Sequence, residues 1–206
     1  MKKIKIAFQG ERGAYSHIAA EKLFPEAEIK TCSTFEETFK IAFENDNYKI
    51  IIPIENSLAG RVADIHYLLP KYKLQIYGEH FQKVEHCLLV KKEAELKDIK
   101  FIRSHTQDIG QCQNRITQNN FATLISADTA GSAKELSEGK DNTISAIASE
   151  LSAKIYNLKI LKKNIEDESG NVTRFLIMGK AVKQPEFDSK KKYITTCIFR
   201  LKSEPS

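Results

Sequence analysis

The 206-residue sequence has no tryptophan, only 9 glycines and 5 prolines, and no long apolar run. The low glycine and proline content excludes collagen-like and low-complexity proteins, and 41% apolar with 29% charged residues is typical of a globular protein. No stretch approaches the ~18 apolar residues of a membrane-spanning helix. Lys5 and Gln9 interrupt the N-terminal apolar stretch, which indicates a first β-strand rather than a signal peptide. We therefore expect a cytoplasmic protein with no membrane partner.

Signatures of disulfides, metal sites and nucleic-acid binding are also missing. The four cysteines form no C-x-x-C pair, so we expect reduced cysteines that pack in a cytosolic protein. The five histidines show no ligand-like spacing, and no metal is expected. The net charge of +5 is mild and the lysine runs contain no stacking aromatics, so no nucleic-acid partner is expected, although a small polyanionic ligand would suit this charge. The cysteines are Cys32, Cys87, Cys112 and Cys197.

Short β-like runs alternate with segments of helical periodicity along most of the chain. Strands are expected at 4–8, 28–32 and 48–54, with helices at 14–24 and 34–45 between them. This alternation favours the α/β class, with mostly parallel sheets covered by helices. The expected strands are too many for one small sheet, so two α/β lobes around a cleft are predicted. Further helices are expected over 62–69, 107–119, 130–138 and 149–156.

Several residues set expected boundaries of these elements. Ser33 and Glu36 have the spacing of a capping box at the start of a helix. Pro70 is expected to end the helix that precedes it. Gly78 is expected to interrupt the β-rich segment Leu74–Val90, which would carry the chain from one lobe to the other.

The C-terminal part of the sequence reads as a separate segment. Residues 183–192 are charged and contain Pro185, which predicts a linker. Residues 193–206 begin with alternating apolar positions, which predicts a β-strand. Because a lone strand is not stable, it either pairs with the main body or begins a further domain.

Polar segments follow several of the expected strands. In open α/β sheets, ligands bind beyond the carboxyl ends of the strands, where helix N-termini offer free N–H groups. The first such segment contains Gly10 and Gly13, which allow close backbone approach. It lacks the third glycine of a dinucleotide fingerprint, and a turn without function explains it equally well.

The second polar segment follows the most hydrophobic expected strand. It offers the carboxylate of Glu55, the amide of Asn56 and the hydroxyl of Ser57, with Gly60 to bend the loop. Helix capping by Asn56 or Ser57 would explain one of these residues. It would not explain Glu55 and Asn56 together, so a functional role is favoured.

The third polar segment surrounds the start of the helix expected over 107–119. Ser104 or Thr106 could cap this helix. His105 and Gln107 would then face whatever the helix dipole attracts, and Gln111 lies on the same helix face as Gln107. Capping and anion binding both remain open for this cluster.

The fourth polar segment is Asn171–Phe175, which opens an apolar strand. Thr173 could be present only as a β-former, and Arg174 only as a surface residue. The preceding loop, residues 166–170, is polar and needs no such anchor. A hydroxyl next to a permanent cation at the entrance of a strand therefore favours a site.

Taken in order, the four segments resemble the prephenate dehydratase family, which includes the arogenate dehydratases. The resemblance covers about residues 4–180. The family commonly has proline where this chain has Thr106, which affects the rigidity of that loop more than its chemistry. The matching residues are Gly10, Gly13, Ile54–Ser57, Gly60, Val62, Asp64, Leu68–Leu69, Gly78–Glu79, His86, Leu88–Leu89, Ser104–His105, Gln107, Gln111–Cys112, Asp128–Ala130, Ala146–Ser149, Asn164–Ile165, Asn171 and Thr173–Phe175.

The resemblance implies a fold like the type II periplasmic binding proteins. It implies a catalytic domain over residues 1–182, with lobe 1 at about 1–78 plus 171–182 and lobe 2 at about 79–170. Residues 193–206 resemble the first strand of an ACT regulatory domain, which is incomplete here, and phenylalanine is expected as an effector only where that domain is complete. A homodimer or homotetramer is expected.

The implied activity is that of a carbon–oxygen lyase, which converts prephenate to phenylpyruvate with loss of water and carbon dioxide, in phenylalanine biosynthesis and without a cofactor. Two alternatives stay open: arogenate as the substrate, and a two-lobed module that binds a small ligand without catalysis. 

The resemblance also assigns roles to residues. Thr173 is expected to donate a hydrogen bond to the leaving hydroxyl. Glu55, Asn56 and Gln111 are expected to contact the ring hydroxyl and the carboxylates. A further hypothesis, from the residue itself, is that a buried Glu55 beside the anionic substrate would be driven toward its neutral form and could then donate a hydrogen bond. The other expected substrate contacts are Ser57, Gly60, Ser104, His105, Gln107, Arg174 and Phe175.

Overall fold

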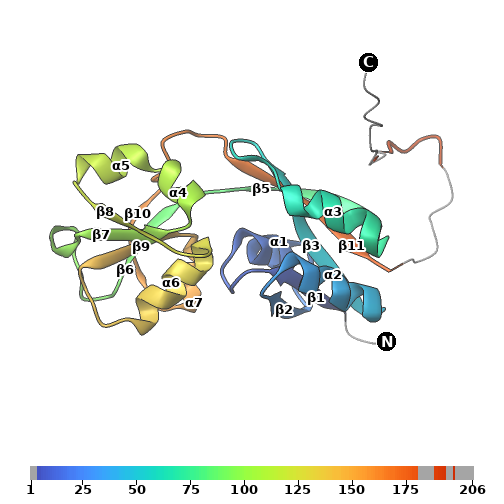
Figure 1. Cartoon of the computed structure of the whole chain (residues 1–206), viewed down its shortest axis with the longest axis horizontal. Coiled ribbons are helices and arrows are strands. Elements are labelled where there is room, and N and C mark those ends of the chain that lie inside the picture. Colours follow the sequence, from blue (N-terminus) through green and yellow to red (C-terminus); the bar gives the residue numbers. More distant parts are fainter. Residues whose placement is uncertain (1–3, 181–187, 194–196, 198–206) are drawn as a thin grey trace, which may run out of the picture.

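The chain folds into two α/β lobes, each built on one β-sheet (Figure 1). The computed structural model describes residues 4–180, 188–193 and 197. The expectation of an α/β protein with two lobes is confirmed. The first lobe contains β1 (Lys5–Gln9), α1 (Tyr15–Leu23), β2 (Glu28–Cys32), α2 (Phe35–Glu44), β3 (Tyr48–Asn56), β4 (Gly60–Arg61), α3 (Ala63–Tyr72), β5 (Gln75–Lys83) and β11 (Val172–Gly179).

The second lobe consists of a five-stranded sheet and short helices. Its elements are β6 (Cys87–Val90), the 3₁₀ helix η1 (Leu96–Asp98), β7 (Phe101–Ser104), α4 (Thr106–Gly110), α5 (Gln113–Gln118), β8 (Ala122–Ile125), α6 (Thr129–Glu138), β9 (Ile144–Ala148), α7 (Glu150–Ile155) and β10 (Lys159–Lys163).

Both sheets have the same topology. The first has the order β2-β1-β3-β11-β5, in which β2, β1 and β3 are parallel and β11 is antiparallel to both of its neighbours. The second repeats this pattern as β8-β7-β9-β6-β10, with β6 antiparallel to β9 and β10. The lobes are therefore two copies of one arrangement, as expected for a fold of the type II periplasmic-binding-protein kind.

The chain passes between the lobes twice, through residues 84–86 and residues 164–171. Gly78 does not end the strand, but the expected irregularity is present there as a register shift, since Ile177 pairs with Gly78 and Met178 pairs with Ile76. Strand β5 runs through Gly78, which pairs with Ile177, and continues to Lys83. Because β5 and β11 remain paired up to this point, the chain leaves the first lobe after Lys83, later than the boundary expected near residue 78. The expected linker and the expected strand at 193–206 lie largely outside the described residues.

Apolar residues on both faces of β3 hold the first lobe together. Ile50 and Ile52 pack with the buried ring of Phe39 on one face, while Ile51 packs with Phe175 on the other. A strand that is apolar at consecutive positions is typical of a sheet covered on both faces. This fixes β3 in the middle of the lobe, with its polar C-terminal end directed at the space between the lobes.

Some expected element boundaries differ in the structure. The N-cap of α2 is Thr34, which accepts a hydrogen bond from the Glu37 amide at 3.0 Å. The Glu37 carboxylate accepts from the amide and hydroxyl of Ser33, both at 2.8 Å, so the expected box is shifted by one residue. Pro70 lies inside α3 and does not end it, because a proline in the last turn removes only one backbone hydrogen bond.

The single helix expected over 107–119 is two helices, α4 and α5, which are separated at Gln111 and Cys112. Cys32, Cys87 and Cys112 are buried, as expected for packing residues, whereas Cys197 is exposed. Among the described residues, no helix is long and apolar enough to cross a membrane.

Candidate active site

A cavity of about 570 Å³ lies between the lobes. Its volume is within the range of ~300–1,000 Å³ that is usual for small-molecule sites. It is bordered by the C-terminal ends of strands and the starts of helices from both lobes, which is where α/β sheets bind ligands. The polar residues that line it are Gln9, Ser16, Asn56, Arg61, Asp64, His105, Gln107, Asp108, Gln111, Asp128, Thr129, Asn171 and Thr173.

Strand geometry decides which side chains reach this cavity. Asn56 on β3 pairs with Thr173 on β11, and Glu55 pairs with Arg174 in the next register position. Because successive side chains of a strand point to opposite faces, Asn56 and Thr173 share one face and Glu55 and Arg174 share the other. Asn56 and Thr173 line the cavity. Phe175 lines it as well and is also part of the core of the first lobe.

Backbone amides fix the orientation of the Asn56 side chain. Its Oδ1 accepts hydrogen bonds from the amides of Leu58 at 3.0 Å and Ala59 at 2.9 Å. Its Nδ2 must therefore face the opposite way, where it donates to Asn171 Oδ1 at 2.6 Å and to Thr173 Oγ1 at 3.0 Å. Within the described residues the Thr173 hydroxyl hydrogen has no acceptor, so it is available to a molecule in the cavity.

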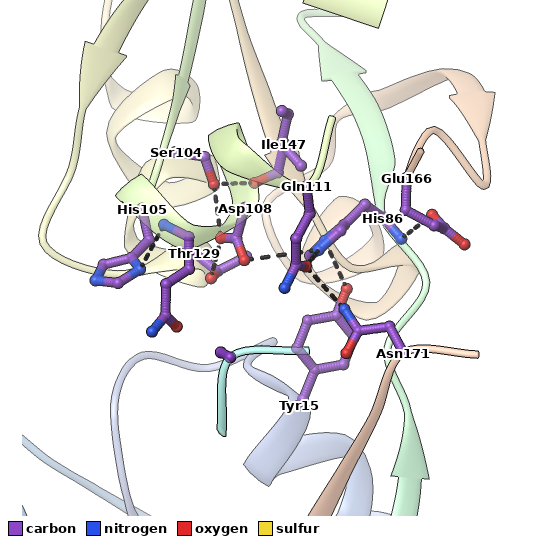
Figure 2. A network of polar contacts seen from close by, with 12 residues as sticks. Tyr15, His86, Ser104, His105, Asp108, Gln111, Thr129, Ile147, Glu166 and Asn171 are labelled. Carbon is purple, nitrogen blue, oxygen red and sulfur yellow. Dashed lines mark hydrogen bonds and ion pairs between the residues drawn. The ribbon is translucent and has the colours of Figure 1, made fainter. Parts of the chain in front are cut away.

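Asn171 and Gln111 continue this chain of amides into the second lobe. Asn171 Nδ2 donates to Gln111 Oε1 at 2.7 Å, and the same oxygen lies 2.9 Å from His86 Nε2 (Figure 2). The side-chain nitrogen of Gln111, Nε2, has no hydrogen-bond partner among the described residues. Since Gln111 lines the cavity, its N–H₂ group is a second free donor there.

In the second lobe, Asp108 accepts the hydrogen bonds that connect the residues of the cavity wall. Ser104 donates to Asp108 Oδ2 at 2.9 Å and to the carbonyl of Ile147 at 2.9 Å, and Thr129 donates to the same Asp108 oxygen (Figure 2). Ser104 is fully buried beneath Asp108. It therefore supports the wall and does not line the cavity. His105 is the N-cap of α4 and accepts from the Gln107 amide at 3.3 Å.

The structure thus brings together only part of the expected site. Asn56, Gly60, His105, Gln107, Gln111, Thr173 and Phe175 all line the cavity between the lobes. Glu55, Ser57, Ser104 and Arg174 do not.

Glu55 and Arg174 line only a second cavity, of about 420 Å³, which shares Asn56, Gly60 and Arg61 with the cavity between the lobes. Arg174 forms ion pairs with Glu55 at 3.1 Å and with Glu79 at 2.8 Å, and it lies 5.9 Å from the ring centre of Phe81. The hydrogen bond that Arg174 donates to the Glu55 carboxylate raises the pKa of Arg174, so the guanidinium stays charged. The side chain of Glu55 is 52% exposed, so the burial on which the hypothesis of a neutral Glu55 depends is not present. The ion pair between Arg174 and Glu55 connects β11 to β3 on the face of the sheet away from Thr173.

The first polar segment of the sequence, which contains Gly13, connects the two lobes through hydrogen bonds. Ser149 Oγ donates to the Gly13 carbonyl at 2.6 Å, and the Tyr156 hydroxyl donates to the Arg12 carbonyl at 2.9 Å. Gly13 has a φ of +95°, and a Cβ built there would lie 2.3 Å from Ser152 Oγ. Glycine is therefore needed at this contact. From the sequence alone, the segment with Gly10 and Gly13 could equally have been a turn without function.

Burial shifts the pKa of two groups beside the cavity. It raises the pKa of Tyr15 well above its ordinary value, with Asp108 acting in the same direction, so the Tyr15 hydroxyl stays protonated. Burial also raises the pKa of Asp128, although its hydrogen bond from the Gly131 amide opposes this. Among the described residues, no group of three or more His, Cys, Asp or Glu side chains is arranged to hold a metal ion.

Sequence reasoning missed Asn171 and Arg61 and assigned no role to His86. His86 was visible only as a matching position in the family resemblance, and Asn171 was visible as the first residue of the fourth polar segment but was given no role. Arg61 follows Gly60 directly, and a cation beside a glycine at the end of a core strand is the signal that could have identified it.

The fold and the cavity define a two-lobed α/β protein with a polar cavity between its lobes. Residues 6–183 match the family described as prephenate dehydratase, and the chain belongs to this family. The resemblance seen in the four polar segments is thereby confirmed.

Relatives of two kinds support the assignment. Arogenate dehydratase/prephenate dehydratase 2, chloroplastic, of Arabidopsis thaliana is 36% identical over 203 residues, covering 98% of this chain and 53% of that protein. The bifunctional N-acyl-homoserine lactone acylase/prephenate dehydratase of Komagataeibacter europaeus is 39% identical over 202 residues, covering 97% of this chain and 71% of that protein. The chain thus spans about half the length of the plant relative.

A solved structure has the same fold. The crystal structure of the prephenate dehydratase from Staphylococcus aureus subsp. aureus Mu50 matches with a TM-score of 0.75 and 27% sequence identity, covering 91% of this chain and 69% of that one.

Proposed function

We propose that the protein converts prephenate to phenylpyruvate, with loss of water and carbon dioxide, in phenylalanine biosynthesis. One observation carries this proposal. The side-chain amide of Asn56 donates a hydrogen bond to the hydroxyl oxygen of Thr173, which leaves the hydroxyl hydrogen of Thr173 free in the cavity. The family membership and the names of the relatives support it.

The reaction requires a hydroxyl to leave a ring that becomes aromatic. The electrons of the bond between the ring and its carboxylate enter the ring as carbon dioxide departs. The electrons of the carbon–oxygen bond leave with the hydroxyl oxygen, which takes up one proton from the medium and becomes water. A threonine hydroxyl is a weak acid, so Thr173 contributes by donating a hydrogen bond to the departing oxygen. Gln111 supplies a second donor for the substrate.

A direct assay tests the proposal. The protein is incubated with prephenate, and the formation of phenylpyruvate and carbon dioxide is followed. We expect turnover with equal amounts of both products. Saturable binding of prephenate without product would instead assign the protein to the non-catalytic binding modules, and the proposed function would be wrong.

Arg61 is the group best placed to bind a carboxylate of prephenate. It is the only arginine or lysine among the described residues that line the cavity, and no described carboxylate forms an ion pair with it. Losing a hydrogen bond to a charged group costs about 1.5–3 kcal/mol, so we expect Arg61→Ala to raise KM for prephenate by about 10- to 100-fold. The value of kcat should change little, and Arg61→Lys should recover part of the loss.

The matched control is Lys92→Ala, which removes one positive charge from an exposed position outside the cavity. Steady-state kinetics at constant ionic strength should show an unchanged KM for this variant. An equal rise of KM in both variants would mean that overall charge, and not Arg61, attracts the substrate.

Arogenate is the second candidate substrate, and one observation favours it. The carboxylates of Asp64 and Asp128 also line the cavity. Arogenate carries an ammonium group in place of the side-chain keto oxygen of prephenate, and a carboxylate is a natural partner for an ammonium group. Competing both substrates in one reaction decides between them, because prephenate yields phenylpyruvate and arogenate yields phenylalanine.

Three further expectations stay predictions. The cytoplasm is the proposed location, and a homodimer or homotetramer the proposed assembly. Phenylalanine is proposed as an effector only where a complete ACT domain is present. The prephenate dehydratase of Arthrobacter aurescens has been solved in complex with L-Phe, which supports testing this ligand.

A further inference from the structure

A buried histidine stands behind the amides of the cavity. His86 lies in the connection between β5 and β6 and is fully buried. Its backbone amide donates to the Glu166 carboxylate at 3.0 Å, and its carbonyl accepts from the Ile165 amide at 3.1 Å. The backbone of both lobe connections therefore fixes its position.

The ring of His86 faces three polar groups (Figure 2). Its Nδ1 lies 3.1 Å from the Tyr15 hydroxyl, which is also 2.8 Å from the Glu85 carbonyl. Its Nε2 lies 2.9 Å from Gln111 Oε1 and 3.6 Å from Asp108 Oδ1. Both neighbours of Nε2 are oxygens.

The direction of the hydrogen bonds can be followed from the backbone to this ring. The amides of Leu58 and Ala59 fix Asn56, and Asn56 then fixes Asn171 with its Oδ1 as an acceptor. Asn171 must donate through Nδ2, so the atom of Gln111 that it meets is the carbonyl oxygen. A carbonyl oxygen cannot donate, and the His86 Nε2 that contacts it must therefore carry a hydrogen.

We propose that His86 is a positioning residue that carries a proton on Nε2 and holds Gln111 with its amide nitrogen in the cavity. Two donors, from His86 and Asn171, hold the Gln111 oxygen. Without the donor from His86, the Gln111 amide is free to turn its oxygen towards the substrate, and Asn171 loses its fixed partner. The arrangement of the hydrogen bonds between Gln111 and Thr173 then depends on Asn56 alone.

Nitrogen-15 NMR of histidine-labelled wild-type protein tests the protonation of His86. The experiment needs no substrate and no turnover. We expect a proton on Nε2 of His86, visible as a directly bonded N–H signal. The His86→Gln variant identifies the signal by its loss. An Nε2 without a proton would overturn the proposal, even in an enzyme that converts prephenate.

The kinetic part of the proposal rests on the proposed function. His86→Leu removes the donor from a buried network, so we expect kcat to fall by about 10- to 100-fold with KM changed by only a few-fold. His86→Gln is the matched control, because its side-chain amide can place an N–H near the position of Nε2, and it should recover most of kcat. Equal losses in both variants would overturn the positioning role.

A double-substitution cycle separates positioning from general damage. Because the side-chain amides of Gln111, Asn171 and Asn56 connect His86 to Thr173, His86→Leu should reduce kcat much less in a Thr173→Ala background than in the wild type. Fully additive losses would contradict the proposal. A protonated Nε2 in a protein without turnover would leave the hydrogen-bond assignment standing and refute the proposed function alone.

Discussion

Thr173→Ala should reduce kcat by about 10²–10⁴, the contribution that a positioned proton donor makes to such a step. The hydroxyl oxygen of Thr173 accepts from Asn56 at 3.0 Å, so its hydrogen is left for the departing oxygen of the substrate. KM should change by only a few-fold, because other residues of the cavity bind the carboxylates. Phenylpyruvate formation at saturating prephenate measures the loss.

Thr173→Val and Thr173→Ser are the controls for this result. Valine keeps the β-branched shape in β11 without the hydroxyl, and serine keeps the hydroxyl without the methyl group. The valine variant should be folded and as slow as the alanine variant, and the serine variant should retain part of the rate. A valine variant with wild-type kcat would remove Thr173 from the chemistry.

Gly13→Ala should destabilise the protein by considerably more than an ordinary glycine substitution. Its added Cβ would lie 2.3 Å from Ser152 Oγ and 2.8 Å from Ser152 Cα, and the backbone atom has little freedom to move. Left-handed backbone costs a non-glycine residue about 1–2 kcal/mol, and overpacking adds about 1–3 kcal/mol. Urea denaturation followed by circular dichroism measures the difference in the free energy of unfolding.

Gly170→Ala is the matched control for Gly13→Ala. Gly170 has a φ of +90°, close to the +95° of Gly13, but nothing lies within 4 Å of its added Cβ. The free energy of unfolding of Gly170→Ala should fall only by the cost of the left-handed backbone conformation. Equal losses in the two variants would show that the contact between Gly13 and α7 does not restrict the packing of the lobes.

Much of the fold follows from the apolar pattern of the sequence. The run Ile50–Ile52 predicts a strand covered on both faces, and the alternation of strands and helices predicts two α/β lobes. Gly78 marks a register shift in β5 and not the end of the strand, because β11 pairs with β5 on both sides of it and comes from a distant part of the chain.

The site could be predicted only in part. Asn56, Gln111 and Thr173 were identified, but Glu55 was grouped with Asn56 because a loop was expected after Ile54. Strand β3 continues to Asn56, and adjacent strand residues point to opposite faces. The network around Asn171 joins residues 115 and 60 positions apart, and no local pattern reveals contacts of this kind.

A crystal structure of Thr173→Val, frozen shortly after a soak with prephenate, shows directly how the substrate lies, since this variant should bind prephenate and convert it about 10²–10⁴ times more slowly than the wild type. The account predicts prephenate in the cavity between the lobes, with its ring hydroxyl next to residue 173 and a carboxylate at Arg61. Prephenate bound at the outer cavity of Glu55 and Arg174, or with its ring hydroxyl turned away from residue 173, would contradict it.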